Sequence, residues 1–258
     1  MRCIFLILAG WLSFCTAVVA QQNTPVRVAV AANFKLTVDR LAVEFSKKNG
    51  ELTPLVSSGA TGLLYSQIRQ GAPFDVFFAA DQVRPARLEA EGRIVPGSRH
   101  TYAIGKLVLW RPGRPWSGTL EQALRASDVR VVAIANPAVA PYGAAAQQVL
   151  EALRLWRDPP FRIVQGESLG QAFQFVASGN AQVGFISLSQ VMESPQARRA
   201  ILAEEIEEID QRLYAPLAQD AVLLQRSANN PAASRFMEFV RGPEGRAIIS
   251  QAGYAASP

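Results

Sequence analysis

Cysteine is nearly absent from this chain of 258 residues, and its two cysteines, Cys3 and Cys15, both lie close to the N-terminus. From residue 16 onward no disulfide can form, and no thiolate is available as a nucleophile or a metal ligand. The fold must therefore be stabilised by a hydrophobic core. The chain is long enough to build that core in one large domain or in two smaller lobes.

Residues that commonly carry catalysis are also scarce. The one histidine, His100, follows a turn at Pro96–Gly97, which predicts an exposed loop. The sequence has no Gly-x-Ser-x-Gly motif and no histidine cluster suited to a metal. Asp75 and Asp81 flank an apolar run, but roles as helix caps or hydrogen-bonded strand ends explain them better than a catalytic pair. We therefore expect neither an enzyme nor a resident cofactor.

Long apolar runs are confined to the first 20 residues. This stretch holds a single charge, is almost continuously apolar from Cys3 to Val19, and ends in the small residues Ala17–Ala20. The pattern predicts a secretory signal peptide over residues 1–20, cleaved after Ala20. An uncleaved membrane anchor fits so short a stretch less well, and the bulky Phe14 fits a lipoprotein cleavage site poorly. We therefore expect an exported protein of the periplasm.

Runs of like charge are missing as well. The chain has 26 Lys and Arg against 21 Asp and Glu, a net charge of +5, and the basic residues are scattered. Without a basic cluster or an RNA-binding aromatic motif, nucleic acid is not an expected partner. A weak positive field would help to attract a small anion.

The rest of the chain alternates strand-like with helix-like segments. One helix is predicted after Asn33, where Phe34, Val38, Leu41 and Phe45 recur at spacings of four, three and four. The expected strands are short apolar runs, at residues 26–31, 55–56, 76–80, 106–110, 129–135, 161–164, 183–186 and 221–224. This alternation predicts an α/β fold of mostly parallel sheets flanked by helices. Because strand–turn–helix units occur twice before and twice after about residue 105, we expect two similar lobes that face a shared cleft.

Four turns between an expected strand and an expected helix have similar compositions. Each places small, hydroxyl or amide residues at a helix start: Ala31–Asn33, Gly59–Gly62, Ala140–Gly143 and Glu167–Gly170. Helix starts carry free backbone N–H donors and the positive end of the helix dipole. None of the four has the lysine of a nucleotide-binding phosphate loop. If they converge, they form an uncharged donor cage for a small oxyanion.

The neutrality of this cage limits the kind of anion it suits. A protonated phosphate would need an acceptor, and Glu167 is the only carboxylate in the four turns, so the pattern favours a fully ionised dianion. Taken singly, Asn33 and Thr61 are interpreted more readily as helix caps, Tyr142 as a packing residue and Ser187 as a strand-end hydroxyl. The sequence alone does not establish that the turns converge.

Several segments then occur in a distinctive order: Val28–Phe34, Gly59–Gly62 with Gln67–Ile68, Gly71–Val76 with Ala79–Asp81, Ala135–Pro137, Pro141–Gly143, Val183–Ile186 and Gly242–Gly245. Together they resemble the periplasmic molybdate-binding proteins of ABC importers. The resemblance covers nearly the whole chain after the signal peptide. It implies a type II periplasmic binding protein that holds molybdate or tungstate by neutral hydrogen bonds, with no protein ligand to the molybdenum.

By this resemblance, the contacts to the oxyanion would come from both lobes. Asn33 and Thr61 would contribute from the first lobe, and the backbone N–H groups of Tyr142 and Leu169 from the second. Many members of the family have serine at the first two positions, and asparagine and threonine still donate there. Ser187 stands where many members have a tyrosine, so a shorter hydroxyl would have to make that contact. The implied partner is a membrane permease, and the protein is expected to be a monomer.

The resemblance also divides the chain into lobes. Residues 21–104 with residues 217–258 would form the first lobe, and residues 105–216 the second. Closure of the lobes would be the signal that the permease reads. Three alternatives stay open at this point: a binding protein for another tetrahedral oxyanion such as sulfate, a regulatory anion sensor without transport, and an exported α/β enzyme that depends on His100 or Asp81.

Overall fold

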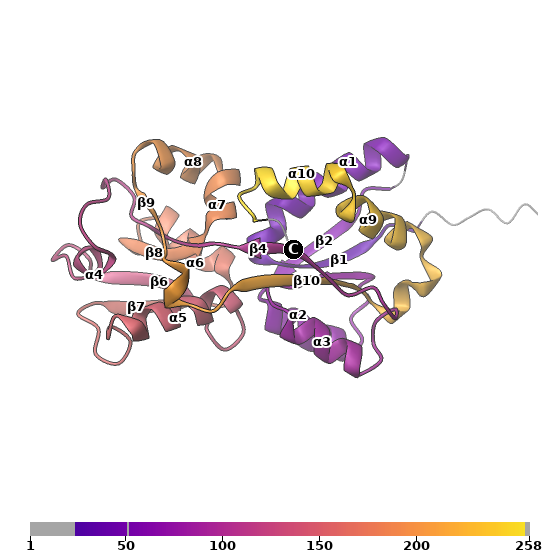
Figure 1. Ribbon diagram of the computed structural model, residues 1–258, viewed down its shortest axis with the longest axis horizontal. Helices are drawn as coiled ribbons and strands as arrows, with labels where there is room; N and C mark the ends of the chain where they lie inside the picture. The colour runs from indigo at the N-terminus through magenta and orange to yellow at the C-terminus, as the bar shows by residue number, and fades with distance from the viewer. Residues whose placement is uncertain (1–23, 51, 256–258) are drawn as a thin grey trace, which may run out of the picture.

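The part of the chain that the structure describes forms two five-stranded sheets that lie side by side, each flanked by helices (Figure 1). The computed structural model describes residues 24–50 and 52–255. The signal peptide predicted at residues 1–20 lies outside these ranges. Within them, no helix is both long and apolar enough to cross a membrane.

The two sheets have corresponding strand orders. The first is β2-β1-β3-β10-β4 and the second is β7-β6-β8-β5-β9. The strands of the first are β1 Arg27–Ala31, β2 Leu55–Gly59, β3 Val76–Phe78, β4 His100–Gly105 and β10 Leu217–Leu223. Those of the second are β5 Leu107–Trp110, β6 Val131–Ala135, β7 Arg162–Gly166, β8 Val183–Ser187 and β9 Ile206–Glu208. In each sheet four strands run one way and one strand, β10 or β5, runs against them. The sheets are therefore mixed but mostly parallel, as the strand–helix alternation predicts.

Helices cover both faces of each sheet because successive strand residues point to opposite faces. Val28 and Val30 pack with α1, α9 and α10, whereas Ala29 between them packs with α2 and α3. The second sheet is covered by α4 and α5 on one face and by α6, α7 and α8 on the other. The helices are α1 Lys35–Asn49, α2 Thr61–Arg69, α3 Val83–Ala90, α4 Leu120–Leu124, α5 Pro141–Ala152, α6 Leu169–Ala177, α7 Leu188–Glu193, α8 Pro195–Leu202, α9 Pro231–Arg241 and α10 Pro243–Gln251.

The chain passes between the sheets twice. β4 ends at Gly105 and β5 begins at Leu107. After β9 the chain returns through the 3-10 helix η2 (Gln211–Leu213) to β10. We call the first sheet with its helices the first lobe, and the second sheet with its helices the second lobe. The exact boundaries at residues 104/105 and 216/217 stay a prediction, which the strand membership of the sheets supports.

Two strands, β4 and β9, are not predicted by the sequence pattern. β4 begins with polar residues and pairs with β10 across an irregularity between Gln219 and Asp220. β9 is an edge strand of three residues, two of them glutamates. Both strands depend on pairing with a neighbour rather than on an apolar pattern of their own, which explains why periodicity misses them.

His100 is the first residue of β4, so the prediction of an exposed loop is wrong. Its Nε2 atom is buried without a hydrogen-bond partner. Its Nδ1 atom lies 2.7 Å from Nη2 of Arg241, and Nδ1 accepts because a guanidinium can only donate. Burial, together with the charge of Arg241, lowers the pKa of His100 to about 4, although the Ser98 carbonyl and Asp220 oppose this change. His100 is therefore neutral near pH 7.

We predict that His100 makes the folded protein sensitive to acid. Because its pKa of about 4 lies below the ordinary value of 6.5, its contribution to stability is complete above pH 6.5 and is lost as the pH falls through 4. His100→Gln should therefore show a smaller decrease in melting temperature between pH 6.5 and 4 than the unmodified protein. Parallel curves of melting temperature against pH for the two proteins would show that His100 titrates normally.

Gly105 lies where the chain crosses from β4 to β5, and it is packed between the lobes. A Cβ atom at this position would come within 2.0 Å of Oη of Tyr142 and 2.5 Å of Nε2 of Gln219. These two groups belong to the second lobe and to β10, respectively. The absence of a side chain at Gly105 therefore lets both lobes approach the crossing.

We predict that Gly105→Ala lowers the free energy of unfolding by about 1–3 kcal/mol, the usual cost of inserting a methyl group into a filled site. Urea denaturation measures this change. Gly170→Ala is the matched control, because its Cβ would have no neighbour closer than 3.5 Å. Equal stability of the two variants would show that Tyr142 and Gln219 move aside at little cost.

Candidate functional site

A small cavity lies between the two lobes at the point where four strand-to-helix turns meet. Its volume is about 10 Å³, far below the roughly 300–1,000 Å³ of pockets for organic ligands. It is lined by Ala31, Ala32, Asn33, Gly59, Ala60, Thr61, Ala80, Ala140, Pro141, Tyr142 and Leu169. The structure therefore brings together four of the five predicted site residues, two from each lobe.

Asn33 lies in the 3-10 helix η1 (Ala32–Phe34), which follows β1 and leads into α1. Its side-chain Nδ2 donates to Oε1 of Gln219 (2.8 Å) and to Oη of Tyr254 (3.0 Å). An amide nitrogen has two protons to donate, so both are engaged inside the first lobe. The donors that this turn leaves for a ligand are backbone N–H groups at the start of the helix.

Thr61 is the first residue of α2 and is almost fully buried. Its Oγ1 accepts a hydrogen bond from the backbone N–H of Ala80 (3.2 Å), which holds the side chain in the cavity wall. The hydroxyl keeps its own proton for donation, and the backbone N–H lies in the first turn of a helix, where it has no acceptor within the helix. Thr61 thus has two uncharged donors for a ligand.

The second lobe contributes the starts of α5 and α6. Tyr142 is the second residue of α5, and Leu169 is the first residue of α6, so both have first-turn N–H groups. The phenol of Tyr142 accepts a hydrogen bond from Nε2 of Gln219 (3.2 Å). Burial raises the pKa of Tyr142 well above its ordinary value, so the phenol stays protonated.

Three of the four turns lack a side-chain cap. The residues that precede η1, α2 and α5 are Ala31, Ala60 and Ala140, and alanine has no side-chain acceptor. Asn33 and Thr61 lie inside the helices, so the interpretation of these two residues as N-caps is wrong. The fourth turn differs, because Ser168 caps α6 by accepting from the N–H of Gln171.

Ser187 does not line the cavity. It ends β8, and its Oγ accepts from the N–H of Gln190 (3.3 Å) as the cap of α7. The same hydroxyl lies 2.9 Å from Oγ of Ser189. Ser187 is therefore outside the described lining of the cavity, and the ligand contact that the resemblance implies for it stays a prediction.

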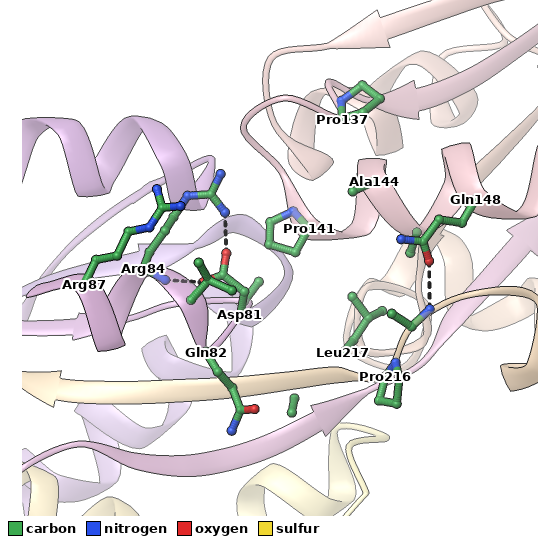
Figure 2. Close-up of a pocket in the computed structure, with 15 residues that line it drawn as sticks. Asp81, Gln82, Arg84, Arg87, Pro137, Pro141, Ala144, Gln148, Pro216 and Leu217 are labelled. Carbon is green, nitrogen blue, oxygen red and sulfur yellow. Dashed lines mark hydrogen bonds and ion pairs between the residues drawn. The ribbon is translucent and has the colours of Figure 1, made fainter. Parts of the chain in front are cut away.

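Charged side chains are absent from the described residues that line the cavity. Asp75 and Asp81 lie at opposite ends of β3 and do not form a pair. Asp75 accepts from the N–H of Arg27 (2.9 Å), whereas Asp81 pairs with Arg84 in a separate hollow between the lobes (Figure 2). Glu167 lines a wider opening beside the cavity rather than the cavity itself. Within residues 24–50 and 52–255, no group of three or more His, Cys, Asp or Glu side chains is suited to hold a metal ion.

A buried hydrogen-bond network lies behind the cavity, and the sequence does not predict it. Oε1 of Gln219 accepts from Asn33 and from the Tyr102 hydroxyl (2.9 Å), while Nε2 of Gln219 donates to Tyr142. Tyr254 donates to the carbonyl of Asn33 (2.8 Å). No pattern in the sequence points to Gln219 or Tyr254, because they are 186 and 221 positions away from Asn33.

Comparison with known proteins places this geometry in a family. The sequence model described as "Bacterial extracellular solute-binding protein" matches residues 26–255. The molybdate-binding protein ModA of Azotobacter vinelandii is 43% identical over 235 residues, which are 91% of this chain and 91% of the relative. The protein of the same name from Rhodobacter capsulatus is 42% identical over 226 residues, 88% and 86% of the two chains.

Solved structures agree with the sequence comparison. The periplasmic molybdate-binding protein of Azotobacter vinelandii matches with a TM-score of 0.81 and 38% identity, over 90% of this chain and 100% of that chain. The sulfate-binding protein SubI of Mycobacterium tuberculosis matches with a TM-score of 0.68 and 16% identity, over 90% and 86% of the two chains, and shares the fold alone. The chain therefore belongs to the bacterial extracellular solute-binding proteins, and its similarity to molybdate-binding members extends over most of its length.

Proposed function

We propose that the protein is the binding component of an ABC importer, which captures molybdate, and also tungstate, outside the cytoplasm and delivers it to a membrane permease. The observation that carries this proposal is the convergence of four helix starts on one small cavity with an uncharged lining. The 43% identity to a molybdate-binding protein supports the choice of anion.

The cavity suits a fully ionised tetrahedral dianion. Uncharged N–H and O–H donors at helix starts stabilise negative charge without the desolvation cost of a buried lysine or arginine in the empty site. A protonated oxyanion would have to donate a proton, and no carboxylate is present among the described lining residues to accept it. Phosphate is therefore a poor fit at neutral pH, because it is partly protonated there.

Each donor can be assigned from the geometry of its turn. We assign the hydroxyl and the N–H of Thr61 to the anion, together with the backbone N–H groups of Asn33, Tyr142 and Leu169. The side chain of Asn33 is left out because Gln219 and Tyr254 engage both of its protons. The molybdenum atom would be surrounded by its own oxygen atoms and would have no protein ligand.

Anion binding would favour the closed arrangement of the lobes. The N–H of Gly62 in the first lobe donates to the carbonyl of Val139 in the second (2.8 Å), so the lobes touch at the edge of the cavity. An anion that accepts from both lobes binds more tightly when they are together, and this difference in affinity drives closure. The closed form is the state that a permease would recognise.

The proposal includes no catalytic step and no resident cofactor. His100 is held by Arg241 and Asp81 is paired with Arg84, and neither lines the cavity, so an enzyme that uses them is disfavoured. We further propose that the protein acts as a monomer in the periplasm after removal of its signal peptide. Identification of the permease would separate a transport role from that of a regulatory sensor.

We predict that molybdate and tungstate raise the melting temperature of the protein, whereas sulfate and phosphate do not. A ligand present at a hundred times its dissociation constant stabilises by about 2.7 kcal/mol, which shifts the midpoint by several degrees. The measurement is a thermal-shift titration with the four anions at matched ionic strength. A shift with sulfate alone would identify sulfate, rather than molybdate, as the ligand. The absence of a shift with any of the four anions would refute the oxyanion site.

We predict that Thr61→Ala lowers the affinity for molybdate by about 10- to 100-fold, because a hydrogen bond to a charged group contributes about 1.5–3 kcal/mol. Isothermal titration calorimetry measures the affinity. Thr61→Ser is the matched control, since it keeps the hydroxyl and should bind nearly as well as the unmodified protein. Equal affinity of the alanine and serine variants would remove the Thr61 hydroxyl from the site.

A further inference from the structure

Helix α7 of the second lobe makes polar contacts with the first lobe at two points outside the cavity lining. Oγ of Ser189 donates to the carbonyl of Asn33 (3.0 Å). One turn further along α7, Oε2 of Glu193 accepts from Oγ1 of Thr37 in α1 (2.6 Å). Ser189 and Glu193 are four residues apart, so they lie on the same face of the helix.

The Glu193 contact is a buried, charge-assisted hydrogen bond. The Glu193 side chain is only 5% exposed, and Thr37 is fully buried. The second carboxylate oxygen, Oε1, accepts from Nη1 of Arg40 (3.3 Å), which also belongs to α1. Both oxygens of Glu193 are therefore bound to the first lobe, although the residue belongs to the second.

The Ser189 contact reaches the turn that carries Asn33. The Asn33 carbonyl accepts from Ser189 in the second lobe and from Tyr254 in the first. Ser189 is in turn 2.9 Å from Ser187, the residue predicted to touch the anion. A chain of hydroxyl groups therefore joins the end of β8 to the Asn33 turn.

Apolar packing accompanies these hydrogen bonds. Gly253 near the C-terminus packs closely against Leu188 and Met192. A Cβ atom built on Gly253 would be only 3.2 Å from a side-chain carbon of each. Helix α7 thus contacts α1, the Asn33 turn and the C-terminal segment of the first lobe. Its remaining side includes Val191, which packs in the core of the second lobe.

We propose that α7 forms an interlobe clasp, in which Glu193 binds Thr37 and Ser189 binds the Asn33 carbonyl, and that this clasp slows release of the bound anion. Glu193 and Ser189 are positioning residues, since neither lines the cavity. The clasp joins the two lobes, so it favours the closed arrangement in the presence and absence of ligand. Its effect on release rests on the proposed function, whereas its effect on lobe closure does not.

The clasp should slow dissociation. Its hydrogen bonds exist only while the lobes are together, so their loss lets the closed complex open sooner. Glu193→Ala is expected to speed molybdate release about tenfold or more, given the strength of a hydrogen bond to a carboxylate. Glu193→Gln keeps an acceptor for Thr37 and should show a smaller effect, and Ser189→Ala should also speed release.

The test combines two measurements on each purified variant. Release is followed by chasing radiolabelled molybdate with an excess of unlabelled molybdate, and lobe closure is followed by the radius of gyration of the ligand-free protein in small-angle X-ray scattering. Glu193→Ala should release molybdate faster and show a larger ligand-free radius than the unmodified protein. Glu193→Gln and Ser189→Ala provide milder changes if the alanine variant fails to fold.

Asp75→Asn is the matched control. Asp75 is as buried as Glu193, with a side chain 3% exposed, but its partners, such as Arg27 and Asn230, belong to the first lobe. This control should lower the melting temperature without changing release or radius. Unchanged release and radius in all three α7 variants would overturn the clasp. If the unmodified protein fails to bind molybdate, the proposed function falls, and the ligand-free scattering alone then decides on the clasp.

Discussion

The convergence of backbone N–H donors from two lobes is the constraint on which the rest of this structure depends. A dianion that meets no positive side chain needs several such donors, and one helix start supplies only a few of them with a partial charge. In both lobes the helices begin at the carboxyl ends of parallel strands, so the turns after β1, β2, β6 and β7 point toward one place. Neither lobe alone contributes more than half of the donor-bearing turns.

Glutamine and tyrosine side chains behind the cavity fix the positions of these turns relative to one another by hydrogen bonds. Gln219 joins Asn33 of the first lobe to Tyr142 of the second, and it lies on β10, the strand that returns from the second crossing. Gly105, at the first crossing, leaves room for the same pair. The side chains that position the donor-bearing turns therefore lie beside the two places where the chain passes between the lobes. A change in the relative position of the lobes would thus change the shape of the cavity. All of these side chains are uncharged.

Ser187 lies at the junction of β8 and α7, beside the contacts that join the two lobes. The resemblance implies a ligand contact there, which stays a prediction. In the structure the Ser187 hydroxyl lies outside the described cavity lining, where it bonds to Gln190 and Ser189. Ser189 in turn donates to the carbonyl of Asn33. Glu193 on the same helix adds the one buried carboxylate that binds across the lobes in this part of the described chain, and burial raises its pKa although Thr37 and Arg40 oppose this.

The sequence by itself determined the α/β class, eight of the ten strands in the described part of the chain and the four turns. Each of these follows from a local pattern of apolar spacing or of small residues. It also pointed to the helix starts that hold Asn33, Thr61, Tyr142 and Leu169, since helix starts are local features, whereas the individual ligand contacts are implied by the family resemblance. Only the tertiary structure decided that these turns meet, that the Asn33 amide is taken by Gln219 and Tyr254, and that His100 begins a strand. These outcomes depend on contacts between residues far apart in the chain, and no local periodicity records which distant side chains will share a hydrogen bond.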